Sequence, residues 1–113
     1  MRWILRSKIH KATVVEADVN YVGSITIDET LMLKTGLWPG EKVLVVDNTN
    51  GARIETYVMI GEKDSGLICM NGASAHLIHK GDEIIVMGFE LTDAYIKPQV
   101  ILVDKDNKFV RYM

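Results

Sequence analysis

The sequence contains a single cysteine, Cys69, which excludes a disulfide bond within the chain. One free thiol suits a reducing compartment, so we expect a cytoplasmic protein. Lysine and arginine number 13 and aspartate and glutamate 15, so the formal net charge is only −2. The chain therefore lacks the basic surface that binds nucleic acid or an anionic membrane. No apolar run approaches the ~20 residues of a membrane span, and charges interrupt the apolar N-terminal residues where a signal peptide needs an unbroken segment. We expect neither nucleic acid nor a membrane as a partner.

What is present is typical of a globular domain. The chain has 113 residues, of which 48% are hydrophobic and 25% charged. That length predicts one domain, residues 1–113, which buries about two-thirds of the surface of its unfolded chain. We find no internal repeat, linker or low-complexity segment.

One short helix is predicted over residues 29–35. Asp28 is a candidate N-cap and Gly36 the candidate C′ residue. Glu29 near the start and Lys34 near the end follow the charge order that a helix dipole favours. A further helical turn is expected before Gly81.

Most other segments alternate apolar and polar residues or are rich in β-branched residues, and turn residues separate them closely. This pattern favours a mainly β protein, a small β-barrel with little helix. Asn50-Gly51 marks a hairpin, and residues 17–20 are expected to bend. In the first strand, Lys8, His10, Ala12 and Val14 should share one face. The expected strands are 3–16, 42–47, 52–60, 67–70, 83–89, 99–103 and a short C-terminal strand.

The stretch Tyr21–Ile27 places Gly23 directly before Ser24. A serine hydroxyl lies close to the carbonyl of the preceding residue and can attack it, shifting the acyl group from nitrogen to oxygen. Gly23 helps because it has no Cβ and adopts backbone angles closed to other residues. On the dipeptide alone, an ordinary turn is the favoured interpretation.

Five motifs together resemble one known family, the pyruvoyl-dependent aspartate 1-decarboxylases. They are Lys8-Ile9-His10, Tyr21-Val22-Gly23-Ser24, Thr49-Asn50-Gly51-Ala52-Arg53, Thr56-Tyr57 and Asn71-Gly72-Ala73-Ser74-Ala75-His76. They follow the family's order and spacing, and the similarity covers nearly the whole chain. The resemblance implies a mainly β fold, a six-stranded double-psi β-barrel with one or two short helices. It also implies a homotetramer with active sites at subunit interfaces.

The same resemblance implies self-cleavage between Gly23 and Ser24, which gives fragments 1–23 and 24–113. Residue 24 then becomes a covalent pyruvoyl group, so neither a metal nor pyridoxal phosphate is required. The implied reaction converts L-aspartate to β-alanine and CO2 for pantothenate and coenzyme A biosynthesis. It runs through a Schiff base between the pyruvoyl group and the substrate amine. Whether maturation needs an accessory protein is left open.

Roles for individual residues follow from the resemblance. Ser24 and Tyr57 are implied as catalytic, Tyr57 as the proton donor to the substrate carbon. Thr56 is implied as the oxyanion donor during processing and as a substrate contact. Two cations, Lys8 and Arg53, match positions that bind the substrate carboxylates. The remaining implied positions are Gly72, Ala73 and Ser74, which bind substrate, and His10, Tyr21 and Asn71, which line the site.

Some points stay open at this level. Strict alternation points Thr56 and Tyr57 to opposite faces of a strand, so either the strand is bulged or neighbouring subunits supply the two. Ser74 stands where the family usually has alanine, and the tail after Tyr95 differs from the family. His76 and His79 without a third ligand make a poor zinc site, so we expect no metal.

Two rival functions remain. A non-catalytic β-barrel binding module on the same scaffold would not need Gly23-Ser24, Arg53 and Tyr57 together, and their joint presence favours the enzyme. A decarboxylase acting on glutamate or another amino acid differs only in the length of its pocket, which the sequence does not define.

Overall fold

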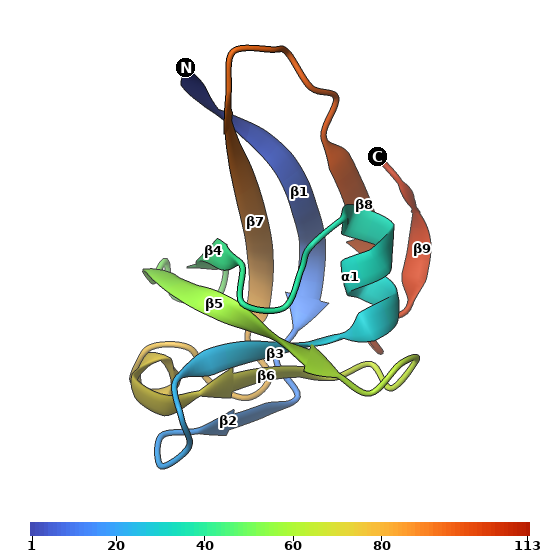
Figure 1. Ribbon diagram of the computed structural model, residues 1–113. Helices are drawn as coiled ribbons and strands as arrows, with labels where there is room; N and C mark the ends of the chain where they lie inside the picture. Colours follow the sequence, from blue (N-terminus) through green and yellow to red (C-terminus); the bar gives the residue numbers. More distant parts are fainter.

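The computed structural model describes all residues, 1–113, and is built mainly from strands (Figure 1). The mainly β class predicted from the sequence is confirmed, and so are its one or two short helices. The strands are β1 (Arg2–Thr13), β2 (Glu16–Asp18), β3 (Ser24–Asp28), β4 (Lys42–Asp47), β5 (Arg53–Gly61), β6 (Ile68–Asn71), β7 (Glu83–Thr92), β8 (Gln99–Val103) and β9 (Phe109–Tyr112). The helices are α1 (Glu29–Thr35) and a 3-10 helix, η1 (Gly72–His76).

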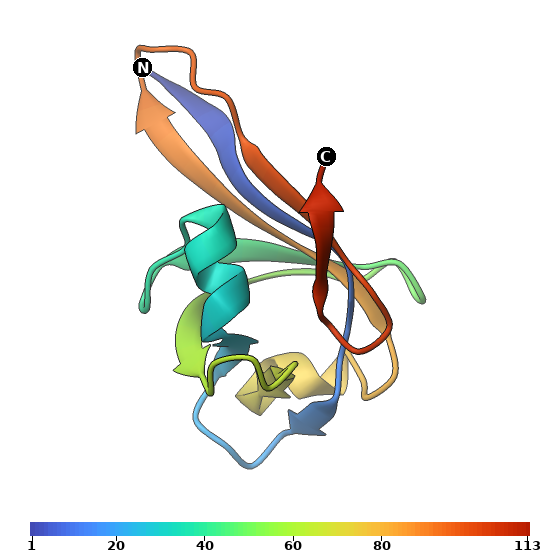
Figure 2. The same cartoon turned by 90° about the vertical axis from the view of Figure 1, so that its right-hand side faces the viewer.

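The nine strands form one hydrogen-bonded succession in the order β2-β6-β3-β5-β4-β7-β1-β8-β9. Strand β5 joins two parts, because it pairs with β3 on one side and β4 on the other. In Figure 1, β3, β6 and β2 lie below β5, while β1 and β7 rise above it. Figure 2 shows that β1, β7 and the connection that follows β7 extend together away from the rest of the molecule. The first and last strands of this order do not pair with each other.

A single core of 18 buried apolar residues lies between these strands and α1. Both parts of the sheet contribute: Ile25 and Ile27 come from β3, and Val43 and Val45 from β4. Leu31 and Met32 bring one face of α1 onto this core, and α1 contacts β1, β3, β5 and β8. Burial of these side chains drives folding at roughly 25 cal/mol per Å² of apolar surface.

The predicted helix is confirmed at both ends. Asp28 Oδ1 accepts the backbone N–H of Thr30 at 2.9 Å, as an N-cap does. Gly36 has φ 77° and donates its N–H to Met32 O at 2.8 Å, which ends the helix. Asp28 also ties the turn after β5 to this helix, because its carboxylate accepts N–H groups from Asp64 and Gly66.

Two expectations about the first 20 residues were wrong. The strand expected over residues 3–16 ends at Thr13, and Glu16–Asp18 forms β2 instead of entering the predicted bend. The pairing of β1 with β7 also shifts register between Ile9 and Ala12, and Lys11 has φ 65°. This bulge turns Ala12 to the buried side with Ile9, so Ala12 does not share the face of Lys8 and His10.

Candidate active site

A cleft of about 440 Å³ opens where β3 begins, β5 passes and β6 runs into η1. Its size lies in the range of small-molecule sites. Six of the residues singled out from the sequence line it together, and so do three that were not. The nine are Gly23, Ile54, Glu55, Thr56, Tyr57, Asn71, Ala73, Ser74 and Leu77.

Ser24 is the first residue of β3 and is only 2% exposed. It lies directly opposite Asn71 in the antiparallel pairing of β3 with β6. The side-chain amide of Asn71 donates to Ser24 Oγ over 3.0 Å. The hydroxyl next to the Gly23–Ser24 peptide bond is therefore held by a buried donor and shielded from solvent.

Gly72 brings a second backbone segment against the same peptide. It has φ 75°, and a Cβ built on it would lie 2.6 Å from Gly23 Cα and 2.8 Å from Gly23 N. Both distances are far below van der Waals contact, so only glycine fits here without moving the chain. The loop that enters η1 thus packs directly on the candidate cleavage site.

Thr56 and Tyr57 both line the cleft, although they alternate on β5 with Thr56 half-buried and Tyr57 38% exposed. The register between β4 and β5 is regular, so the bulge considered from the sequence is absent. β3 pairs with β5 only from Val58 onward. The earlier part of β5 runs past the start of β3, and residues from both of its faces reach the cleft at this open edge. A single chain therefore supplies both side chains.

Besides Ser24 and Gly72, four residues singled out from the sequence do not line this cleft. Lys8 lies on β1, opposite Met87 on one side and Val100 on the other. Arg53 begins β5 and is exposed. Tyr21 is 62% exposed and lines a separate hollow of about 270 Å³ with Asn71. His10 does not line the cleft either.

His10 has an unusual environment. Its ring Nδ1 is buried and has no hydrogen-bond partner. Burial lowers the pKa of His10 below its ordinary value of 6.5, and the charges of Lys8 and Lys11 lower it further, while Glu83 acts in the opposite direction. The imidazole is therefore neutral near pH 7.

Sequence reasoning missed Ile54, Glu55 and Leu77 in the cleft wall, and it missed Thr26 beside it. Thr26 Oγ1 accepts a hydrogen bond from Asn71 Nδ2 at 3.0 Å. The sequence did contain a signal for Thr26. It lies two residues after Ser24, and this spacing places the two hydroxyls on the same face of a strand.

No group of three or more His, Cys, Asp or Glu side chains is placed to hold a metal ion. His79 instead contacts the carbonyl of His76 at 3.0 Å and the carboxylate of Asp82 at 3.7 Å. Cys69 is buried, and burial raises the pKa of its thiol above the ordinary value. None of the helices is both long and apolar enough to span a bilayer.

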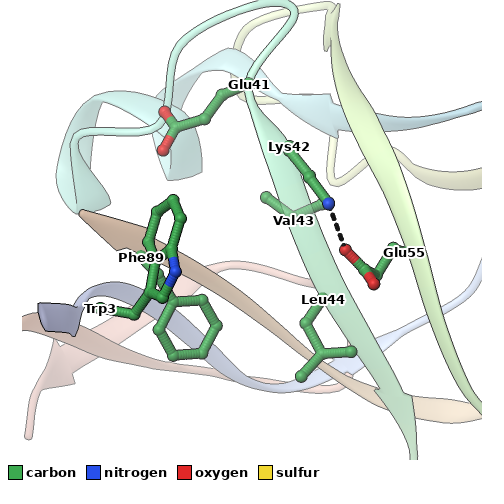
Figure 3. Close-up of a pocket in the computed structure, with 7 residues that line it drawn as sticks. All are labelled: Trp3, Glu41, Lys42, Val43, Leu44, Glu55 and Phe89. Carbon is green, nitrogen blue, oxygen red and sulfur yellow. Dashed lines mark ion pairs between the residues drawn. The ribbon is translucent and has the colours of Figure 1, made fainter. Parts of the chain in front are cut away.

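A second hollow, of about 350 Å³, lies between β4, β1 and β7 (Figure 3). Its floor is apolar, and the rings of Trp3 and Phe89 face it. The charged Lys42 and Glu55 at its rim are paired with each other at 2.6 Å. It is lined by no serine, threonine or cysteine, and by none of the residues singled out from the sequence.

Comparison with known proteins identifies the class. Residues 1–110 match the family model described as aspartate decarboxylase. Aspartate 1-decarboxylase 1 of Frankia casuarinae is 58% identical, over 97% of this chain and 74% of its own length. Aspartate 1-decarboxylase of Corynebacterium efficiens is 56% identical over 97% of this chain and 84% of its own length. Aspartate 1-decarboxylase of Caldicellulosiruptor bescii is 55% identical over 96% of this chain and 88% of its own length.

These similarities define the class of protein as a carboxy-lyase, an enzyme that releases a carboxyl group as CO2. The chain belongs to the aspartate decarboxylase family, as its five motifs predicted.

Proposed function

We propose that this chain cuts itself between Gly23 and Ser24, converts residue 24 to a pyruvoyl group, and then decarboxylates L-aspartate to β-alanine. The observation that carries the proposal is the environment of Ser24. A buried serine accepts a hydrogen bond from Asn71 and directly follows Gly23, which lines one cleft with Thr56 and Tyr57. Membership of the aspartate decarboxylase family supports the same reaction.

The cleavage needs no outside reagent except water. Ser24 Oγ bonds to the carbonyl carbon of Gly23, the peptide C–N bond breaks, and the nitrogen takes up the hydroxyl proton, which gives an ester. The Cα proton of residue 24 then passes to water and the Cβ–Oγ bond breaks, so its electron pair stays on the new carboxylate of Gly23. The resulting enamine takes up a proton on Cβ and becomes an imine. Water then replaces the nitrogen on Cα, ammonia leaves, and a pyruvoyl group remains.

Thr56 is proposed to assist the first step. Negative charge develops on the carbonyl oxygen of Gly23 during the attack, and a fixed hydroxyl donor stabilises it. Thr56 and Gly23 line the same cleft. Removal of one donor of this kind typically raises a barrier by about 3–4 kcal/mol.

The residues around position 24 fit a pyruvoyl group. Ser24 is already covered, and the close contact of Gly72 with Gly23 shows how little space surrounds the peptide. A pyruvoyl ketone forms a Schiff base with a primary amine and acts as the electron sink when CO2 leaves. Tyr57 reaches the cleft with a partly exposed ring, and we assign it the proton delivered to the substrate carbon.

Aspartate carries two carboxylates, and the cleft of one chain has no arginine or lysine in its wall. We propose that Lys8 and Arg53 reach it from a neighbouring subunit of a homotetramer, with His10 and Tyr21 nearby. Exposed apolar side chains on β5 support such an interface, because Met59 and Ile60 are 47% and 50% exposed. Family membership also supports a double-psi β-barrel as the topology of the strands.

The test is to incubate purified protein with L-aspartate and to measure β-alanine and CO2, with L-glutamate as a comparison. Trapping with cyanoborohydride should add the reduced substrate mass to fragment 24–113 only. Ser24→Ala should remain uncut and inactive. A binding module would bind without forming product, and decarboxylation by Ser24→Ala would contradict the proposal.

A further inference from the structure

One side-chain amide joins two hydroxyls at the start of β3. Asn71 Nδ2 lies 3.0 Å from Ser24 Oγ and 3.0 Å from Thr26 Oγ1, and it donates to both. An amide nitrogen carries two N–H bonds, so both donors of Asn71 are in use. The amide plane is held at two points rather than one.

Strand geometry explains this arrangement. Ser24 and Thr26 are two residues apart on β3, so they project from the same face. On β6, Asn71 lies opposite Ser24 and Cys69 lies opposite Thr26. Asn71 therefore reaches Ser24 directly and Thr26 diagonally, over a separation that side chains span in antiparallel pairs. The group is protected from solvent, because Asn71 is 8% exposed and Thr26 half-buried.

We propose that Thr26 is a positioning residue for the self-cleavage of this chain, and that it acts by holding the Asn71 amide toward Ser24 Oγ. This inference rests on the cleavage proposed above. Thr26 itself touches no atom of the bond that breaks, and its hydroxyl has no other hydrogen bond in the structure.

The hydrogen bond from Asn71 matters most in the elimination step. There the Cβ–Oγ bond breaks and Oγ takes the electron pair, becoming a carboxylate oxygen of Gly23. A donor already placed on Oγ stabilises the charge as it forms and needs no reorganisation. Without Thr26 the amide would be held at one point, and its N–H would spend less time directed at Oγ.

The role is confined to maturation. Oγ departs with Gly23, so the contact from Asn71 to that atom no longer involves residue 24 once the chain is cut. Loss of the Thr26 hydroxyl should therefore slow the appearance of fragments, which is measured without any substrate.

The test uses full-length protein made by pulse-labelled cell-free synthesis, with the uncut fraction followed on denaturing gels. Thr26→Val keeps the side-chain shape and removes the acceptor, whereas Thr26→Ser keeps the hydroxyl. Thr13→Val is the matched control, because Thr13 also lies on a strand and its hydroxyl makes no hydrogen bond. We expect Thr26→Val to cleave about three- to tenfold more slowly, the range for one hydrogen bond. Thr26→Ser and Thr13→Val should cleave within about twofold of the unaltered chain.

A double-mutant cycle with Asn71→Ala separates positioning from a general structural effect. If Thr26 acts through Asn71, then Thr26→Val should slow cleavage no further once Asn71 is alanine. Equal slowing in both backgrounds would overturn the inference, and so would cleavage of Thr26→Val at the unaltered rate. If Thr26→Val has a much lower melting temperature, the cleavage rate of Thr26→Ser is the deciding measurement. Slower cleavage of Thr26→Ser would contradict a role for the hydroxyl, because serine keeps it. Failure of the unaltered chain to cleave would refute the proposed function itself.

Discussion

Replacement of Gly72 by alanine tests how closely the η1 loop controls the cleavage site. Gly72 has φ 75°, and its added Cβ would lie 2.6 Å from Gly23 Cα and 3.0 Å from Tyr21 O. These are backbone atoms, which cannot rotate away as a side chain would. Gly23 would have to move by roughly 1 Å to restore a normal carbon contact.

Gly40 provides the matched control because it has φ 82° and nothing within 4 Å of its added Cβ. Gly40→Ala therefore carries the left-handed strain alone, about 1–2 kcal/mol. Gly72→Ala adds overpacking of about 1–3 kcal/mol. At about 4 °C of melting temperature per kcal/mol for a domain of this size, Gly72→Ala should melt well below Gly40→Ala.

The larger consequence concerns cleavage. A displacement of about 1 Å in a reacting group can cost on the order of 10²-fold in rate, so Gly72→Ala should accumulate as uncut chain while Gly40→Ala matures normally. Calorimetry and time-resolved denaturing gels measure the two effects separately. Cleavage of Gly72→Ala at the unaltered rate, with a melting temperature equal to that of Gly40→Ala, would refute the packing argument.

Three further substitutions test other parts of the account. Tyr57→Phe should be cut normally but form β-alanine about 10²-fold or more slowly per cut chain, because the proton donor is lost; full activity would remove that role. Asp28→Ala should lower the free energy of unfolding in urea by about 3 kcal/mol, because its carboxylate accepts three backbone N–H groups; a loss below about 1 kcal/mol would contradict this. Burial and the neighbouring Asp82 raise the pKa of Asp47 above 3.8, so ionising Asp47 costs stability as pH rises from 3.8 through that raised pKa. The stability of Asp47→Asn relative to the unaltered chain should therefore increase from pH 4 to pH 7. If urea denaturation gives the same difference in free energy of unfolding at every pH, the prediction is wrong.

The features predicted well from the sequence depend on local chemistry. The helix over 29–35 has its own cap at Asp28 and its own stop at Gly36, and both appear in the structure. The hairpin between β4 and β5 was signalled by Asn50-Gly51, and Gly51 has φ 80°. Such signals need no knowledge of the rest of the chain.

The features missed depend on distant partners. β2 is three residues long and exists because Glu16 pairs with Cys69 and Asp18 with Asn71, more than 50 residues away. A strand that short has no periodicity to read. The bulge near Lys11 likewise follows from the pairing of β1 with β7.

The candidate site shows the same division. Motifs identified Gly23, Thr56, Tyr57 and Asn71, and the structure places all four around one cleft. Thr26 could not be distinguished from other strand threonines until Asn71 was known to lie opposite Ser24. Lys8 and Arg53 belong to the same motifs, but in the single chain they do not line this cleft.

The most direct test of the central claim is the intact mass of the purified protein under denaturing conditions. The account predicts two species, residues 1–23 and residues 24–113. The larger should be lighter by one ammonia than the same segment with an N-terminal serine, and it should resist Edman degradation. A single full-length species after prolonged incubation, with or without cell extract to supply a maturation factor, would contradict the account.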